Sequence, residues 1–175
     1  MRNEGAKVFI TDIMEDSVAQ AVELGAEAVS ADEIYDLDVD VFAPCALGAV
    51  INEETLPRLK CKIVAGPANN QLANNEAGNE LEKRGILYAP DYAVNAGGLM
   101  NVSIEFEGWN HERALRMTRT IYYNLGKIFR IAERDGIPTW QAADRMAEER
   151  IATLGKLKMP FMGKPHRFPG RDRKH

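Results

Sequence analysis

Short apolar runs alternate with amphipathic segments over the first 98 residues of the chain. The apolar runs are typical of strands that are buried on both faces of a sheet. In the segments between them, apolar residues recur with the spacing of a helix face. Strands that alternate with helices predict an α/β fold with a parallel sheet. The predicted strands are residues 7–12, 28–29, 39–43, 63–65 and 86–88, and the predicted helices lie within residues 16–24, 30–35, 53–59 and 71–84.

From residue 99 onward the pattern becomes helical, and the alternation with strands stops. We therefore divide the chain into a sheet-forming part, residues 1–98, and a helical part, residues 99–155. Helices are predicted over residues 99–109, 112–134 and 141–154. The middle helix carries an apolar stripe, which needs more than the sheet to bury it. This stripe consists of Leu115, Thr118, Ile121, Tyr122, Leu125, Ile128, Phe129 and Ala132.

Three successive predicted strands end in small residues and side-chain amides. Ala43-Pro-Cys-Ala-Leu-Gly48 and Ala65-Gly-Pro-Ala-Asn-Asn70 follow two of them. Tyr88-Ala-Pro-Asp-Tyr92 follows the last strand, and Asn95-Ala-Gly-Gly98 then opens a helix. Ligands bind at the carboxyl ends of strands in open parallel sheets, and a helix N-terminus offers unpaired N–H groups to an anion. The pattern predicts a ligand site, with a tight strand-to-helix connection that binds no ligand as the alternative for residues 95–98.

Composition narrows the classes of function. A net charge of -4 over 175 residues indicates no general attraction to nucleic acid or to a membrane surface. No apolar run is long enough for a transmembrane helix, and the first residues lack the apolar core of a signal peptide. Cys45 and Cys61 have no metal-like spacing, so we expect reduced thiols and a cytoplasmic protein.

Each candidate binding or catalytic residue also has a structural interpretation that requires no ligand. Asp12 ends the first predicted strand, where a carboxylate either binds the hydroxyls of an adenosine ribose or caps the next helix. Cys45 has no neighbouring histidine or lysine, and we expect a small apolar residue at the edge of the sheet. We find no catalytic triad, metal site or pair of catalytic carboxylates in the sequence.

The segment Lys156–His175 differs in composition from the rest of the chain. It carries seven lysines and arginines, one acidic residue and three prolines. This composition is typical of a solvated, disordered tail. Contact with nucleic acid or phosphate is the less favoured alternative.

The strand-end motifs, taken in order, resemble those of one family. Thr11-Asp12, the three strand-end segments and Asn95-Ala-Gly-Gly98 are similar to motifs of the glutamate/leucine/phenylalanine/valine dehydrogenases, and the resemblance is best to the leucine dehydrogenase branch. Ala142-Ala-Asp-Arg-Met-Ala-Glu-Glu-Arg-Ile151 resembles the same branch. The resemblance covers about residues 5–151, and leaves only the basic tail without a counterpart.

The resemblance implies that the chain is most of the carboxyl-terminal, NAD-binding domain of such an enzyme. The implied fold is a Rossmann-like parallel sheet that lacks its first strand and Gly-rich loop, followed by a helical segment. The missing strand would be the central one, beside residues 7–12. The catalytic lysine and aspartate belong to the family's amino-terminal domain. We therefore expect no catalytic residue in this chain and no activity from it alone.

The resemblance also implies roles for individual residues. Asp12 corresponds to the acid that binds the adenosine ribose, which favours NAD over NADP. Leu99 and Val102 correspond to the substrate side-chain pocket, and lie one helical turn apart. The remaining implied contacts with NAD and substrate are made by Cys45, Ala46 and Leu47 beside the nicotinamide ribose, by the turn of Ala68, Asn69 and Asn70, and by Asn95 near the nicotinamide carboxamide and the substrate. The turn meets the nicotinamide ribose and the substrate carboxylate, and either asparagine can make either contact.

The function implied is reversible oxidative deamination of an L-amino acid to a 2-oxo acid and ammonia, with NAD as hydride acceptor. Two aliphatic pocket residues without a cation favour an apolar amino acid, such as leucine, valine or phenylalanine, over glutamate. The complete enzyme is expected to be a homo-oligomer. The alternatives are a non-catalytic nucleotide- or amino-acid-binding module derived from this domain, and a regulatory domain that binds an amino acid.

Overall fold

The computed structural model describes residues 4–105 and 108–156, and places five short parallel strands in two sheets. In the first sheet β1 pairs with β2, and Phe9 lies opposite Glu27. In the second sheet β4 lies between β3 and β5, and Ile63 lies opposite Val41 on one side and Leu87 on the other. The strands are β1 (Phe9–Ile10), β2 (Glu27–Ala28), β3 (Val41–Phe42), β4 (Ile63–Val64) and β5 (Leu87–Tyr88).

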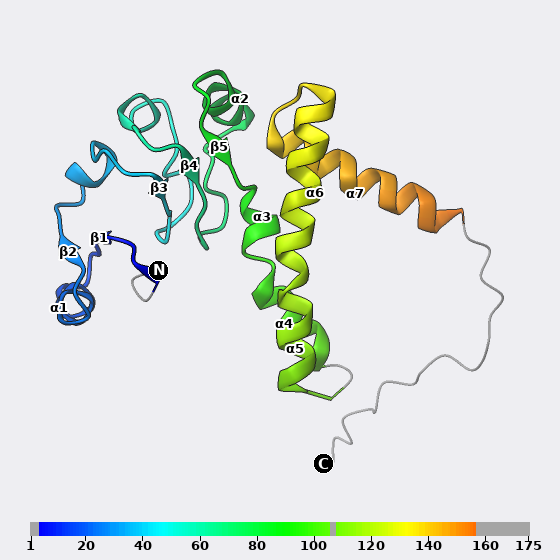
Figure 1. The fold of residues 1–175 in the computed structure, drawn as a ribbon, viewed down its shortest axis with the longest axis horizontal. Coiled ribbons are helices and arrows are strands. Elements are labelled where there is room, and N and C mark those ends of the chain that lie inside the picture. The colour runs from blue at the N-terminus through cyan, green and yellow to red at the C-terminus, as the bar shows by residue number, and fades with distance from the viewer. Residues whose placement is uncertain (1–3, 106–107, 157–175) are drawn as a thin grey trace, which may run out of the picture.

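The two sheets are separate. Among the described residues β1 hydrogen-bonds only to β2, and β3 only to β4, so each has one edge without a partner strand. Figure 1 shows the β1–β2 pair, with α1 beside it, set apart from the three other strands. All five strands were predicted, as was their parallel α/β arrangement, and the structure confirms this class of fold.

Helices and the loops between elements make up the rest of the described chain. Asn74 caps α2 by accepting a hydrogen bond from the Ala77 N–H at 2.9 Å, and Gly136 ends α6 with a φ of 61° that suits glycine. The bounds are α1 (Glu15–Glu23), η2 (Glu33–Tyr35), η3 (Leu56–Arg58), α2 (Asn75–Lys83), α3 (Asp91–Val94), α4 (Gly97–Glu105), α5 (His111–Thr118), α6 (Thr120–Asp135) and α7 (Thr139–Gly155).

The helix predicted over residues 112–134 is wrong in one respect, because it divides at Arg119 into α5 and α6. Threonine hydroxyls on both sides donate to main-chain carbonyls, from Thr118 to Leu115 at 3.0 Å and from Thr120 to Met117 at 2.6 Å. Such bonds compete with the regular helical pattern. The helix predicted from residue 71 begins instead at Asn75, after the Asn74 cap.

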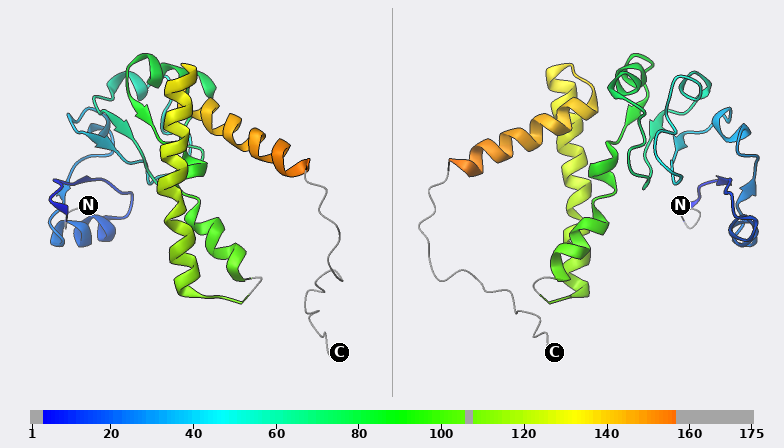
Figure 2. Two further views of the ribbon diagram at one scale, coloured as in Figure 1. Left: turned by 45° about the vertical axis from the view of Figure 1, so that its right-hand side comes forward. Right: turned by 180° about the vertical axis from the view of Figure 1, so that it is seen from behind.

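Two apolar clusters hold the described chain together. The first lies between the β3–β5 sheet and α2, and contains Ile51, Leu56, Leu59, Cys61, Val64, Ala77, Leu81, Ile86 and Tyr88. The second joins α6 to α7, and contains Ile128, Ile131, Ala132, Ala142 and Ala143. Figure 2 shows α6 as a long column from which α7 leads away.

Trp140 connects the two clusters. Its ring packs on Gly78, where a Cβ would lie 2.6 Å from the Trp140 Cδ1 atom. The indole N–H donates to Asn79 Oδ1 at 3.2 Å, so the start of α7 is bound to α2. The predicted helical part therefore packs against the sheet-forming part through this contact, while the predicted basic tail beyond residue 156 lies outside the described residues.

Candidate functional site

The loops that follow β3 and β4 pack against each other with their backbones in contact. The N–H of Ala68 donates to the Pro44 carbonyl at 3.0 Å, and the N–H of Ala49 donates to the Asn70 carbonyl at 2.6 Å. A Cβ at Gly66 would lie 2.3 Å from the Pro44 carbonyl oxygen. Only glycine allows such an approach. The carboxyl ends of β3 and β4 are thus joined into one surface, called here the ligand edge (residues 43–49, 65–71 and 91–95).

Two of the predicted site residues meet at the ligand edge. The side-chain amide of Asn95 donates to Asn69 Oδ1 at 2.6 Å, although the two lie 26 residues apart in sequence. Asn69 and Asn70 are exposed, and Asn95 is half-buried. Asn70 has a φ of 51°, a left-handed conformation that asparagine tolerates better than most residues. The carboxamides of Asn69 and Asn95 therefore meet at one site, where they can donate and accept further hydrogen bonds.

The segment after β3 contributes an exposed surface to the same edge. Cys45, Ala46 and Leu47 are all exposed, and the Leu47 side chain is 91% accessible. The Cys45 Sγ–H donates to the Ala43 carbonyl at 3.4 Å. Desolvation raises the pKa of the Cys45 thiol, so that the neutral form is favoured and a nucleophilic role is not.

Asp12 lies at the end of β1, in the other sheet. Its side chain is exposed, and Oδ1 accepts a hydrogen bond from the Met14 N–H at 2.8 Å. The N-terminal cap of α1 is Met14, whose side chain makes no capping bond. Asp12 therefore stabilises the turn before α1, while its exposure leaves the carboxylate accessible to a ligand.

Leu99 and Val102 lie on α4, one turn apart, just beyond Asn95. Both are exposed, with 76% and 48% of the surface accessible. Neither side chain is packed in the core of the described chain, so both present aliphatic surface on the helix that follows Asn95.

Two polar residues at the ligand edge were not predicted. Gln71 is completely buried, and Asp91 is 7% exposed. The Gln71 N–H donates to Asp91 Oδ2 at 2.8 Å, which links the loop after β4 to the start of α3. The sequence holds only a weak indication that these two residues belong to the site. Asp91 follows a proline at a strand end, and Gln71 follows paired asparagines. Periodicity gives no reason to bury either residue.

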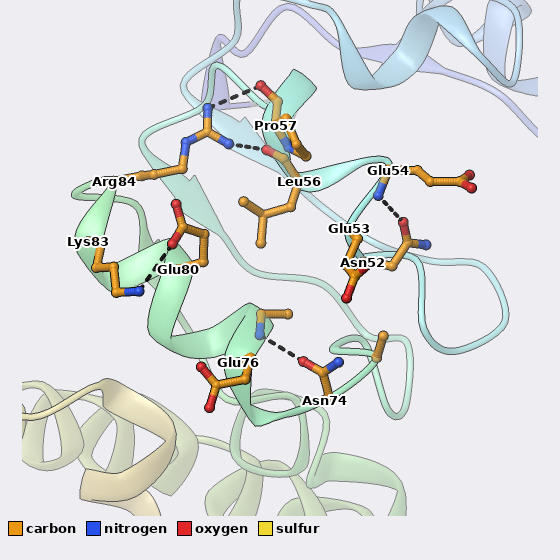
Figure 3. Close-up of a pocket in the computed structure, with 12 residues that line it drawn as sticks. Asn52, Glu53, Glu54, Leu56, Pro57, Asn74, Glu76, Glu80, Lys83 and Arg84 are labelled. Atoms are coloured by element: carbon orange, nitrogen blue, oxygen red, sulfur yellow. Dashed lines mark hydrogen bonds and ion pairs between the residues drawn. The ribbon is translucent and has the colours of Figure 1, made fainter.

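A surface hollow of about 870 Å³ lies between η3 and α2, away from the predicted site residues. Figure 3 shows its wall, where Glu80 pairs with Lys83 at 3.4 Å. The guanidinium of Arg84 donates to the main-chain carbonyls of Leu56, Pro57 and Leu59. These contacts tie η3 to the end of α2, so the Arg84 charge already serves the fold.

Residues 4–105 and 108–156 hold no group of three or more histidine, cysteine, aspartate or glutamate side chains that could bind a metal ion. No helix in this part of the chain combines the length and apolar character needed to cross a membrane.

Comparison with known proteins shows the family of this chain. The sequence profile of the family described as "Glutamate/Leucine/Phenylalanine/Valine dehydrogenase" matches residues 6–158. The chain belongs to this family. The matched range contains all the strand-end segments of the ligand edge.

Individual relatives cover nearly all of this dehydrogenase chain. A leucine dehydrogenase of Thermoactinomyces intermedius is 55% identical over 163 residues, which are 93% of this chain and 44% of the relative. A leucine dehydrogenase of Geobacillus stearothermophilus is 51% identical over 174 residues, 99% of this chain and 47% of the relative. The chain thus spans less than half the length of the curated relatives it matches.

A solved structure has the same fold. The crystal structure of L-tryptophan dehydrogenase from Nostoc punctiforme superposes with a TM-score of 0.82 at 46% identity. The match covers 84% of this chain and 45% of that one. The arrangement of strands and helices described above is therefore that of an amino acid dehydrogenase domain.

Replacement of Gly66 by alanine should separate the two loops of the ligand edge. The added Cβ meets backbone atoms of Pro44 at 2.3 and 2.5 Å, which no rotamer change relieves. We expect a loss of roughly 1–3 kcal/mol in the free energy of unfolding, the usual result of overpacking. Urea denaturation followed by circular dichroism measures it.

Gly126→Ala is the matched control for this experiment. Gly126 lies within α6, and its Cβ would meet only the flexible end of Arg130, at 3.6 Å. Alanine should stabilise that helix by up to about 1 kcal/mol. Equal urea midpoints for the two variants would contradict the close packing of the two loops.

Proposed function

We propose that this chain is the NAD-binding part of an enzyme that oxidatively deaminates an apolar L-amino acid to a 2-oxo acid and ammonia. The observation that carries the proposal is the meeting of Asn69 and Asn95 at 2.6 Å, on the carboxyl edge of the sheet. Carboxamides at that edge suit a ligand rich in hydroxyl, amide and carboxylate groups. Membership of the dehydrogenase family supports the reaction class.

The donor and acceptor groups at the two sheets fit a dinucleotide. The exposed Asp12 carboxylate can accept hydrogen bonds from both hydroxyls of the adenosine ribose. Cys45, Ala46 and Leu47 would line the nicotinamide ribose. When bound, NAD supplies the hydride acceptor. The residues of this chain hold and orient it.

Residues on the substrate side of the edge would orient the amino acid. Asn69 and Asn70 would meet the nicotinamide ribose and the substrate carboxylate, with Ala68 in the same turn. Asn95 would lie beside the nicotinamide carboxamide. Its bond to Asn69 fixes the distance between these two sets of contacts, which restricts how far the substrate can move from the cofactor.

The side chain of the substrate would lie on Leu99 and Val102. Both residues are aliphatic and exposed in the described chain, so an apolar substrate side chain gains by covering them. A γ-carboxylate placed there would lose water without gaining a cation. This favours leucine, valine or phenylalanine over glutamate.

The remainder of the enzyme would supply the other half of the active site. The resemblance implies that the catalytic lysine and aspartate belong to the family's amino-terminal domain, so this chain alone would not turn over. We place the complete enzyme in the cytoplasm as a homo-oligomer.

Joining this chain to the unmatched portion of the Thermoactinomyces intermedius leucine dehydrogenase should produce an active enzyme. We expect NAD reduction that depends on leucine, because the added portion restores the proton-transfer groups, typically worth about 10²–10⁴-fold in rate. The 175-residue chain alone should show none. Absorbance at the wavelength of NADH reports both. A chimera that folds and binds NAD without turnover would favour the non-catalytic binding module instead.

Asp12→Ala in this chimera should raise the KM for NAD and leave the KM for leucine nearly unchanged. Hydrogen bonds to a charged acceptor are worth roughly 1.5–3 kcal/mol, so we expect a rise of about tenfold or more. Asp16→Ala removes another exposed acid, from the first turn of α1, and is the control. Were NAD dependence the same in both variants, Asp12 would serve only the turn before α1.

Leu99→Ala should improve kcat/KM for phenylalanine relative to valine, because it makes room in the pocket. Each methylene of fit is worth ~1–3 kcal/mol, so we expect the ratio to change at least about tenfold. The melting temperature should change little, since Leu99 is exposed. Leu154→Ala on α7, also exposed, is the control and should leave the ratio unchanged. An unmoved ratio in Leu99→Ala rules out the pocket assignment.

A further inference from the structure

Gln71 spans the turn that presents Asn69. Its side chain is completely buried, and its Nε2 donates to the carbonyl oxygens of Gly66 at 2.6 Å and Ala68 at 3.0 Å. Both partners are acceptors, so the amide nitrogen has to face them. One side chain thus holds the backbone on both sides of Pro67. It thereby fixes the direction of the chain at Asn69, which follows Ala68.

Asp91 connects this turn to the residue that Asn69 contacts. Its Oδ2 accepts a hydrogen bond at 2.8 Å from the N–H of Gln71, the residue that follows Asn70. Its Oδ1 accepts from the Tyr92 N–H at 2.6 Å. The main-chain carbonyl of Asp91 accepts from the Asn95 N–H at 2.8 Å. The same buried residue therefore holds both the loop after β4 and the turn that ends at Asn95.

The buried amide of Gln71 is unfavourable for stability in one respect. Its Oε1 has no hydrogen-bond partner among the described residues. A buried acceptor without a partner is destabilising, and an apolar residue of similar size would avoid the penalty. The two donated bonds are the reason for an amide at this position, and those bonds act on the turn rather than on the core.

We propose that Gln71 and Asp91 are positioning residues, which together hold Asn69, Asn70 and Asn95 in a single arrangement at the ligand edge. The proposal rests on the proposed function for its kinetic consequence, since those three residues would orient cofactor and substrate. Neither Gln71 nor Asp91 has to touch a ligand, because both are buried. Their effect passes through the loop and the turn that they connect.

Two substitutions in the chimeric enzyme test the kinetic consequence. Gln71→Met removes both donated bonds at similar volume, and Asp91→Asn replaces an acceptor oxygen by a donor group. We expect each to lower kcat/KM for leucine at least about tenfold, because misplacement of orienting groups by about 1 Å costs up to about a hundredfold. Rates are measured well below the melting temperature of each variant.

Asn79→Leu is the matched control. It removes another hydrogen bond, from the Trp140 indole at 3.2 Å, between α2 and α7 and outside the ligand edge. It should lower the melting temperature while kcat/KM stays within about twofold of the parent. If Gln71→Met and Asp91→Asn behave like Asn79→Leu, their role is stability alone and the proposal is overturned.

Gln71→Glu adds a pH profile that a merely structural role would not produce. As a carboxylate, the new side chain faces two carbonyl oxygens and can donate to neither. When protonated it can donate to one. We expect kcat/KM relative to the parent to recover in part as the pH falls. A relative value that does not change with pH would contradict the positioning of the turn by donated bonds.

Hydrogen exchange in the 175-residue chain separates this proposal from the proposed function. Without any substrate, Gln71→Met should speed amide exchange in residues 91–95 as well as in residues 66–71, and Asp91→Asn should do the same. If each variant speeds exchange only in its own segment, the positioning proposal fails, even where the parent chimera is active. If each variant speeds exchange in both segments but the parent chimera is inactive, the positioning holds and the proposed function fails.

Discussion

Contact between two backbones is the constraint on which the candidate site depends. The loops after β3 and β4 approach so closely at Gly66 that any side chain would overlap Pro44. Main-chain hydrogen bonds from Ala68 and Ala49 then satisfy polar groups that this contact would otherwise bury without partners. Two loops that follow different strands become one surface, which is what an orienting site requires.

The candidate cofactor contacts are distributed over two sheets that share no hydrogen bonds within the described residues. Asp12 follows β1, whereas Asn69 follows β4. A dinucleotide that used both would span the space between β1 and β3. The distance between its two ends would therefore depend on what lies between those strands. Each strand has an unpaired edge there, and such edges favour the addition of a further strand.

The helical part of the chain is packed at one end and open at the other. Toward α7, α6 buries Ile128, Ile131 and Ala132, and Trp140 docks the pair on α2. Toward α5, Leu115 and Tyr122 of the predicted stripe are exposed. In the proposed enzyme this open end would face the domain that carries the catalytic residues. That position explains why Leu99 and Val102, on the neighbouring helix, are exposed as well.

The sequence by itself determined the strands, their parallel α/β arrangement and the family, because hydrophobic periodicity and short motifs are local properties of the chain. It also indicated that the strand ends around Asn69 and Asn95 belong together, since parallel strands end at one edge. Only the tertiary structure decided that Gln71 leaves the predicted helix to bind Gly66 and Ala68, and that Asp91 is buried beside it. Hydrogen bonds between residues 20 positions apart have no periodic signature in the sequence.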